Sequence, residues 1–406
     1  MTTRPPAQPA AAQVFKKHFG FVPPHAVRVP GRLELLGNHT DYNGGLVMSV
    51  AVDRYLEIAA SPRNDGRIEL FSSAFPNPVK FSVSTFEKDD QSPWANYLKG
   101  VLAALRKREV FFGGFNAAID STIPAGSGLS SSAALELATA LIVRKLHPYQ
   151  LTDTGARRPP KADSRGRLPL IARKEKMSLA RLCREAENEF VGVNCGLLDQ
   201  VSCLFGKEGH ALELDCLHET VSHHPLIGDF AIVLFDSGVR HQLVASEYNL
   251  LRHHCELAAR KLGVKFLRMI DPPALLAQRY KLTPTEYRRA SHVVSEIQRV
   301  SFATRVLREN DLAQFGQFMF QSHESSRDLM RNSCPELDKL VELAQGAEGC
   351  LGARLTGGGF GGATLNLVER SHLQPFLRRV QTGFNNEFGR VPAMQVCRTV
   401  SGPTGV

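Results

Sequence analysis

A loop rich in glycine and serine constrains this sequence more than any other feature. The loop contains Pro124, Ala125, Gly126, Ser127, Gly128, Leu129, Ser130, Ser131 and Ser132. It follows an apolar, strand-like run (115–119) and leads into a helix-like run (133–145). Glycines let several backbone N–H groups point one way, at the positive end of the following helix. Such a place binds an anion, usually a phosphate.

Two common phosphate-binding motifs do not fit this loop. A Walker A motif requires Gly-Lys-Ser/Thr after the glycines, and a dinucleotide fingerprint requires another glycine spacing and an acidic partner. The three consecutive serines instead offer hydroxyls to phosphate oxygens or to a magnesium ion. Taken alone, the loop is equally compatible with a turn that caps an ordinary helix.

Length and composition restrict the class of protein. A chain of 406 residues with 43% hydrophobic content is long enough for two domains with substantial cores. No apolar run approaches the length of a membrane span, and the polar start of the chain lacks the apolar segment of a signal peptide. We therefore expect a cytoplasmic protein without a membrane partner. The eight cysteines contain no C-x-x-C pair, which argues against a zinc site and a disulfide framework.

The formal net charge of +9 is concentrated in one segment, about residues 146–176. This segment holds Pro159 and Pro160 and shows little periodicity, which predicts a mobile basic insertion on the surface. Its single aromatic residue, Tyr149, gives poor support for base stacking, so nucleic acid is not the expected partner.

Strand-like and helix-like runs alternate irregularly, which predicts an α+β fold rather than a doubly wound sheet. Residues 46–52 and 55–60 read as two strands, and Ser178 stands at the N-cap position of a helix that reaches residue 190. We place a domain boundary near residue 215, giving an N-terminal domain of residues 1–215 and a C-terminal domain of residues 216–406.

Two further segments complete a recognisable set with the loop. One is Gly31-Arg32-Leu33-Glu34-Leu35-Leu36-Gly37-Asn38-His39-Thr40-Asp41-Tyr42-Asn43-Gly44-Gly45, and the other is Leu355-Thr356-Gly357-Gly358-Gly359-Phe360-Gly361-Gly362. In order and type, the three segments resemble those of the GHMP kinases (galactokinase, homoserine kinase, mevalonate kinase and phosphomevalonate kinase), and the first is most similar to that of galactokinases. The resemblance covers nearly the whole chain and implies a two-domain fold with the active site in the cleft between the domains.

The resemblance also implies the roles of individual residues. ATP would be bound by Pro124, Gly126, Ser127, Gly128, Leu129, Ser130, Ser131 and Ser132, and Mg²⁺ by Ser132 and Glu187. Asp199 would take the proton from the anomeric hydroxyl of a sugar, with Arg32 beside it. Asn38, His39, Asp41, Tyr248 and Gly358 would bind the sugar. The implied reaction is the ATP-dependent phosphorylation of a monosaccharide, most readily D-galactose to α-D-galactose 1-phosphate, by a monomer.

The sequence departs from the galactokinase pattern at two positions. Galactokinases generally have Glu where this chain has Asn38, and Asn where it has Glu34; that Glu normally accepts a hydrogen bond from the primary hydroxyl of galactose. A kinase of the same family acting on another sugar is therefore an alternative. A second alternative is a sugar and ATP sensor without turnover, although the sensors of this family are altered just after the serine run, which is complete here.

Overall fold

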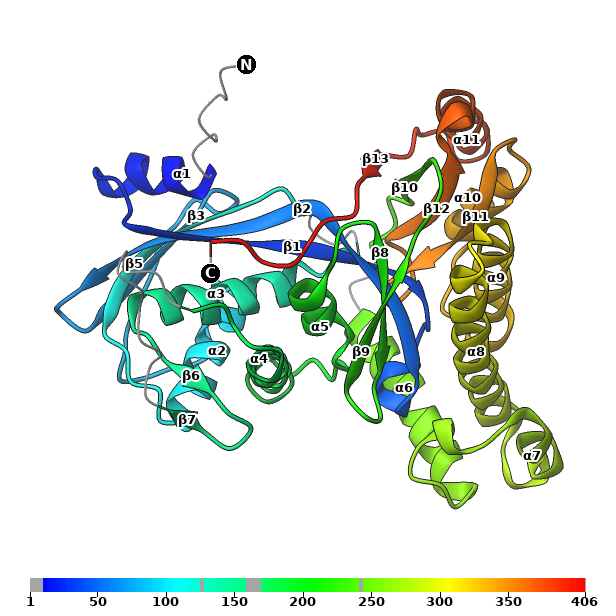
Figure 1. The fold of residues 1–406 in the computed structure, drawn as a ribbon, viewed down its shortest axis with the longest axis horizontal. Helices are drawn as coiled ribbons and strands as arrows, with labels where there is room; N and C mark the ends of the chain where they lie inside the picture. The colour runs from blue at the N-terminus through cyan, green and yellow to red at the C-terminus, as the bar shows by residue number, and fades with distance from the viewer. Residues whose placement is uncertain (1–9, 125–127, 158–168, 241–243, 406) are drawn as a thin grey trace.

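The computed structural model describes residues 10–124, 128–157, 169–240 and 244–405 and arranges them as two sheets with flanking helices (Figure 1). In these ranges the first sheet has seven strands, in the order β4-β3-β5-β2-β8-β9 with β1 paired to β2. They are β1 (His25–Leu36), β2 (Leu46–Arg63), β3 (Arg67–Ser72), β4 (Val79–Ser82), β5 (Gly114–Ser121), β8 (His210–Asp215) and β9 (Thr220–Pro225). The second sheet, in the order β11-β12-β10-β13, consists of β10 (Phe230–Asp236), β11 (Cys350–Thr356), β12 (Ala363–Glu369) and β13 (Met394–Cys397). A short hairpin joins β6 (Gln150–Leu151) to β7 (Ala156–Arg157).

Helices cover the sheets. The α-helices are α1 (Ala10–Phe19), α2 (Ala95–Lys107), α3 (Ser131–Leu146), α4 (Arg173–Glu185), α5 (Leu198–Phe205), α6 (Val244–Lys261), α7 (Pro272–Ala277), α8 (Pro284–Arg308), α9 (Leu312–Ser325), α10 (Pro335–Gln345) and α11 (Leu373–Phe388). Short 3-10 and π-helical turns are η1 (Asp41–Asn43), η2 (Ala186–Val191), η3 (Leu267–Met269), η4 (Arg279–Lys281), η5 (Ser326–Met330) and η6 (Arg370–His372). Helices α2 to α5 lie on one face of the first sheet and α1 on the other, while α8 to α11 accompany the second sheet (Figure 1). This arrangement confirms the expected α+β class.

The two strands expected at 46–52 and 55–60 are one strand, β2. Its pairing with β1 shifts register between Pro30 and Gly31, so that Asp53 and Arg54 lie outside the ladder. The C-terminal segment takes up the freed backbone groups, because the Asp53 amide donates to the carbonyl of Arg398 at 3.0 Å. The interruption that the sequence suggests between residues 52 and 55 is therefore a β-bulge, and the C-terminal segment at Arg398 completes its hydrogen bonding.

The last residues of the chain return to the first sheet, where Thr404 forms a β-bridge with Arg28 beside β1 (Figure 1). The first sheet also continues through β9 to Pro225. The domain boundary proposed near residue 215 stays a prediction. The hairpin of β8 and β9 spans this position.

The basic segment at 146–176 was expected to be a mobile insertion on the surface. In its described ends Arg157, Arg173 and Lys174 are exposed, but three apolar residues anchor these ends in the core. Tyr149, Leu151 and Ile171 are buried in the main core, and the buried Arg144 lies 3.4 Å from Glu175. Residues 158–168, including Pro159 and Pro160, lie outside the described residues.

The helix expected to begin at Ser178 begins at Arg173 instead. Ser178 lies inside it, and its hydroxyl donates to the carboxylate of Asp153 at 2.9 Å. The run of basic residues before Ser178 hid the first turn, because it read as part of the insertion. None of the described helices is long and apolar enough to cross a membrane.

Candidate active site

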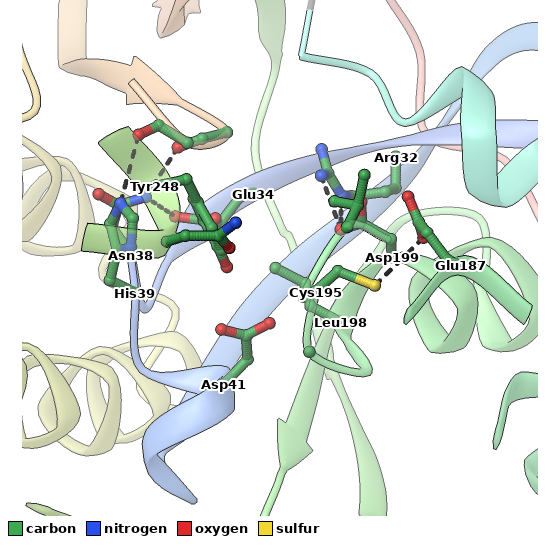
Figure 2. Close-up of a pocket in the computed structure, with 15 residues that line it drawn as sticks. Arg32, Glu34, Asn38, His39, Asp41, Glu187, Cys195, Leu198, Asp199 and Tyr248 are labelled. Atoms are coloured by element: carbon green, nitrogen blue, oxygen red, sulfur yellow. Dashed lines mark hydrogen bonds and ion pairs between the residues drawn. The ribbon is translucent and has the colours of Figure 1, made fainter. Parts of the chain in front are cut away.

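A cavity of 380 Å³ lies where the end of β1 meets α5, α6 and the glycine-rich turn between β11 and β12. It brings together eight of the residues that the sequence singled out: Arg32, Asn38, His39, Asp41, Glu187, Asp199, Tyr248 and Gly358. Figure 2 shows two groups in it, with Glu34, Asn38, His39 and Tyr248 on one side and Arg32, Asp199 and Glu187 on the other. A cavity of this size, lined by polar groups on two sides, suits a small polar molecule.

Arg32 and Asp199 form the centre of the second group. The Arg32 Nε and Nη2 atoms lie 2.8 and 2.7 Å from the same oxygen, Oδ1 of Asp199. The other carboxylate oxygen, Oδ2, accepts a hydrogen bond from the hydroxyl of Ser130 at 2.5 Å. Burial alone would lower the pKa of Arg32, but the carboxylates of Asp199 and Glu34 raise it above its usual value. The guanidinium is therefore permanently charged.

Strand β1 also fixes the end of the phosphate loop. The backbone N–H of Arg32 donates to the carbonyl of Leu129 at 3.2 Å, and its Nη1 donates to the carbonyl of Gly128 at 2.5 Å. The side chain of Leu129 is buried in the core, so it contributes only its backbone. One arginine thus joins the loop to the carboxylate of Asp199.

The described part of the loop turns at a glycine and leads into a helix, as the sequence indicated. Gly128 has a φ of 75° and Ser130 a left-handed φ of 57°, after which α3 begins at Ser131. The Ser130 hydroxyl donates to Asp199 and makes no capping hydrogen bond to α3. Within the described residues, the orphan N–H groups of the first turn therefore stay available for an anion. Pro124 precedes residues 125–127, so the expected ligands Gly126 and Ser127 lie outside the described residues.

Glu187 stands in the π-helical turn η2 that ends α4. Its Oε2 accepts hydrogen bonds from the side-chain amide of Gln200 at 3.0 Å and from the thiol of Cys195 at 3.1 Å, and its carboxyl also hydrogen-bonds Ser132. Burial, together with the charge of Asp199, raises the pKa of Glu187 to about 7. π-Helical turns are rare in proteins, and those that occur are often found at functional sites.

Sequence reasoning missed Glu136, which lies on the buried face of α3 with no exposed surface. Its Oε2 accepts from the same Gln200 nitrogen at 3.1 Å. Burial raises its pKa well above the usual value, and the charge of Glu187 adds to the effect. The sequence did contain an indication of this residue. Between its first turn and Arg144, α3 is almost wholly apolar, so a glutamate in its interior is expected to be buried.

Asp41 lies between the two groups in Figure 2, at the start of η1. One of its oxygens accepts from the N–H of Tyr42 at 2.9 Å. The other lies against Gly196, where a Cβ would come within 1.9 Å of it. Burial raises the pKa of Asp41 to about 6. Gly196 is therefore needed because any side chain there would displace the carboxylate.

His39 is held in a defined orientation. It has a φ of 60°, its Nδ1 lies 2.8 Å from the Tyr42 hydroxyl, and its Nε2 lies 3.2 Å from the carbonyl of Gly358. A carbonyl only accepts, so Nε2 carries the proton and the tyrosine hydroxyl donates to Nδ1. Burial lowers the pKa of His39 to about 3, which keeps the ring neutral. The ring of Tyr248 lies 5.0 Å from that of His39 and covers Gly358.

The two positions that depart from the galactokinase pattern are in contact. Asn38 Nδ2 donates to Glu34 Oε1 at 3.1 Å, and Nη1 of the fully buried Arg354 donates to the same oxygen at 3.0 Å. Burial raises the pKa of Glu34, while the charges of Arg354 and Arg32 oppose the rise. Neither Arg354 nor its contact with Glu34 could be read from the sequence, because 320 residues separate the partners.

Comparison with known proteins defines the class of this fold and site. Models of the GHMP kinase N-terminal domain and C-terminal region match residues 96–158 and 303–386. A crystal structure of mevalonate kinase superposes with a TM-score of 0.62, at 17% identity over 93% of this chain and 99% of the other, which shows a common fold. The protein has the GHMP kinase fold.

More similar relatives narrow the class. The galactokinase galactose-binding signature matches residues 13–62. The galactokinase of Chloroflexus aurantiacus is 39% identical over 96% of this chain and 95% of its own length, and that of Homo sapiens is 39% identical over 91% and 90%. The crystal structure of Lactococcus lactis galactokinase complexed with galactose superposes with a TM-score of 0.87, at 30% identity over 97% of this chain and 98% of that one. The chain belongs to the galactokinase family of sugar kinases.

Proposed function

We propose that the protein transfers the terminal phosphoryl group of ATP to the anomeric hydroxyl of D-galactose, forming α-D-galactose 1-phosphate and ADP. The observation that carries the proposal is the ion pair of Arg32 and Asp199, which joins the end of the phosphate loop to the cavity. Membership of the galactokinase family and the likeness to a galactokinase complexed with galactose support the choice of sugar.

Asp199 is the proposed base. A carboxylate offers about four lone-pair sites. Among the described residues, Arg32 takes two on Oδ1 and Ser130 takes one on Oδ2, so one on Oδ2 is left for the sugar hydroxyl. As the hydroxyl oxygen bonds to the terminal phosphorus, its proton passes to Oδ2 and the bond from phosphorus to the bridging oxygen of ADP breaks.

Arg32 keeps this carboxylate in place and faces the transferring group. Its Nη1 and Nη2 each have a second hydrogen beyond those used by Gly128 and Asp199, and these hydrogens are available to the equatorial phosphoryl oxygens. The backbone N–H groups of residues 126–132, with Pro124 at the entry, form the proposed nucleotide cradle. Fixed donors of this kind stabilise charge that develops in the transition state.

Ser132 and Glu187 are the proposed magnesium ligands, and the donor set fits this ion. Both groups offer oxygen, they contact each other, and Mg²⁺ is usually bound by one or two carboxylates together with substrate phosphates. A bound Mg²⁺ would neutralise phosphate charge during transfer. Gln200 and the Cys195 thiol both donate to Glu187 Oε2 and so orient the carboxylate.

The proposed sugar contacts are Asp41, His39, Tyr248 and Gly358. Asn38, which the resemblance also implied, lines the cavity, but its side-chain amide is engaged by Gly357 and Asn332. Asp41 offers an acceptor, the neutral His39 ring and the Gly358 backbone limit one wall, and Tyr248 provides an aromatic face. Convergent hydrogen bonds discriminate sugars because an analogue without the matching hydroxyl leaves polar groups unpaired.

The second candidate is a kinase for another sugar, which the Glu34 and Asn38 pair favours. An ADP-release screen over galactose, galacturonate, N-acetylgalactosamine and arabinose, with product analysis to locate the phosphate, separates the two. Turnover confined to a sugar other than galactose would refute the first candidate. ATP and sugar binding without turnover would point to a sensor. A cytoplasmic location and a monomeric state stay predictions.

A further inference from the structure

Asn38 lines the cavity, yet its amide is fully used by the protein. Its Nδ2 donates to the carbonyl of Gly357 at 2.8 Å and to Glu34 Oε1 at 3.1 Å, which accounts for both hydrogens. Its Oδ1 accepts from Asn332 Nδ2 at 2.8 Å and from the Ser326 hydroxyl at 3.5 Å, which accounts for both lone pairs. With 1% of its surface exposed, Asn38 has no hydrogen-bonding capacity left for a sugar.

Glu34 is the opposite case. Its Oε1 is engaged by Asn38 and Arg354. Its Oε2 accepts no hydrogen bond from any described residue. This oxygen is not fully buried, and the residue borders the cavity. A carboxylate oxygen is a strong hydrogen-bond acceptor, and the charges of Arg354 and Arg32 favour the ionised form of Glu34 against the effect of burial, which raises its pKa. The cavity therefore offers an unused, oriented acceptor beside Asn38.

The position of Glu34 decides which part of the sugar it would meet. Arg32 and Glu34 are alternate residues on β1 and so share a face of the strand, with Cα atoms roughly 7 Å apart. Figure 2 shows Glu34 in the group opposite Arg32 and Asp199. A sugar whose reacting hydroxyl lies at Asp199 would therefore turn the part of its ring remote from the anomeric carbon toward Glu34. Because Glu34 is only 4% exposed, its acceptor is recessed, and an exocyclic hydroxymethyl group reaches it more easily than a hydroxyl on the ring.

We propose, on the basis of the function proposed above, that Glu34 is a specificity-determining residue whose Oε2 accepts a hydrogen bond from the primary hydroxyl at carbon six of the sugar. Asn38 is a positioning residue that holds Glu34 and does not itself contact the sugar. Asn332 fixes Asn38 in turn, because its amide donates to both Asn38 Oδ1 and the Gly358 carbonyl.

Arg354 explains how a carboxylate persists at this recessed position. Its guanidinium is wholly buried, and within the described residues Nη1 donates to Glu34 while Nε and Nη2 have no partner. The pair therefore balances one buried charge with another. The arrangement also disfavours uronic acids, because a sugar carboxylate at carbon six would face the carboxylate of Glu34.

The test compares galactose with 6-deoxy-D-galactose, which lacks only the hydroxyl in question. In the Glu34→Gln variant the amide oxygen faces Arg354 and an NH₂ group faces the cavity, so a neutral donor replaces the charged acceptor. We expect the ratio of kcat/KM for galactose to kcat/KM for 6-deoxygalactose to fall about tenfold or more, as expected for a lost hydrogen bond to a charged group. The Glu34→Ala variant, which has neither donor nor acceptor, should lower the ratio at least as far.

The ratio separates recognition from stability, because partial unfolding affects both sugars equally. An unchanged ratio in both variants would overturn the inference. Asn38→Ala should lower the ratio in the natural background and leave it unchanged in the Glu34→Gln background; a further drop there would show direct contact of Asn38 with the sugar. The natural protein, without substitutions, tests the proposed galactose phosphorylation on which the inference rests. Absence of galactose turnover in this protein would refute that function.

Discussion

Arg32 and Asp199, 167 residues apart in the sequence, form a two-point ion pair in which both Nε and Nη2 of the guanidinium meet one carboxylate oxygen. Asp199 lines the cavity, and of the residues that the structure describes only Ser130 donates to its second oxygen. The ion pair also aligns the guanidinium with the phosphate loop through Gly128. A base oriented in this way differs from a mobile surface carboxylate, because its free lone pair has a fixed direction.

The first prediction concerns this geometry. Replacing Arg32 by Lys keeps a positive charge but loses the fork that contacts Asp199 twice and Gly128 once. We expect kcat for galactose to fall by at least about tenfold, which corresponds to loss of one charge-assisted hydrogen bond, with the melting temperature lowered only slightly. Steady-state kinetics and differential scanning calorimetry check both. A kcat equal to that of the natural protein would show that charge alone suffices.

Gly196 allows the second prediction. A methyl group at this position would overlap the carboxylate of Asp41, so Gly196→Ala should displace Asp41 and raise the KM for galactose about tenfold, with the KM for ATP unchanged. Gly155→Ala is the matched control, because a Cβ there meets nothing within 4 Å. An unaltered galactose KM in Gly196→Ala would mean that Asp41 does not bind the sugar.

The third prediction concerns pH. The pKa of Asp41 rises from 3.8 to about 6 on folding, so the folded protein retains a proton that the unfolded chain releases. Stability must then fall as the pH rises from about 4 to about 6, by an amount on the order of 2 kcal/mol. In Asp41→Asn this loss is absent. The difference in free energy of unfolding between the two proteins, measured in urea at pH 4, 5, 6 and 7, should grow to pH 6 and then level off.

Glu136 provides the fourth prediction. Because burial raises its pKa well above the usual value, the residue behaves as a neutral acid that resembles glutamine. Glu136→Gln should fold. As the pH rises above about 5, its melting temperature should rise relative to that of the natural protein, because the unfolded chain releases a proton that the folded one keeps. Glu136→Lys should destabilise strongly, since it adds an unpaired buried charge. A difference in melting temperature that stays constant as the pH rises would contradict the assignment.

Much of the site could be predicted from the sequence because its residues stand in short, local segments. The turn at Gly128 is set by its glycine, and the helix that follows it is set by apolar periodicity within about ten residues. A family resemblance then placed these segments around one site, and the structure brings Arg32, Asp41 and Asp199 to one cavity.

The remainder depended on contacts between distant segments. Arg354 on β11 holds Glu34 on β1, and Asn332 saturates Asn38, across separations of 320 and 294 residues. Periodicity carries no information about such pairs, so it could not show which of Glu34 and Asn38 has a free acceptor. The continuity of β2 was missed for the same reason, since the C-terminal segment supplies the partners of Asp53 at the bulge.

The most direct test of the account is turnover by Asp199→Asn, measured as ADP release with galactose beside equilibrium binding of ATP. Asparagine keeps the shape of the side chain but cannot accept a proton at neutral pH. The account predicts a fall in kcat of about 10²- to 10⁴-fold, with ATP affinity within a few-fold of that of the natural protein. Undiminished turnover would contradict the assignment of Asp199 as the base.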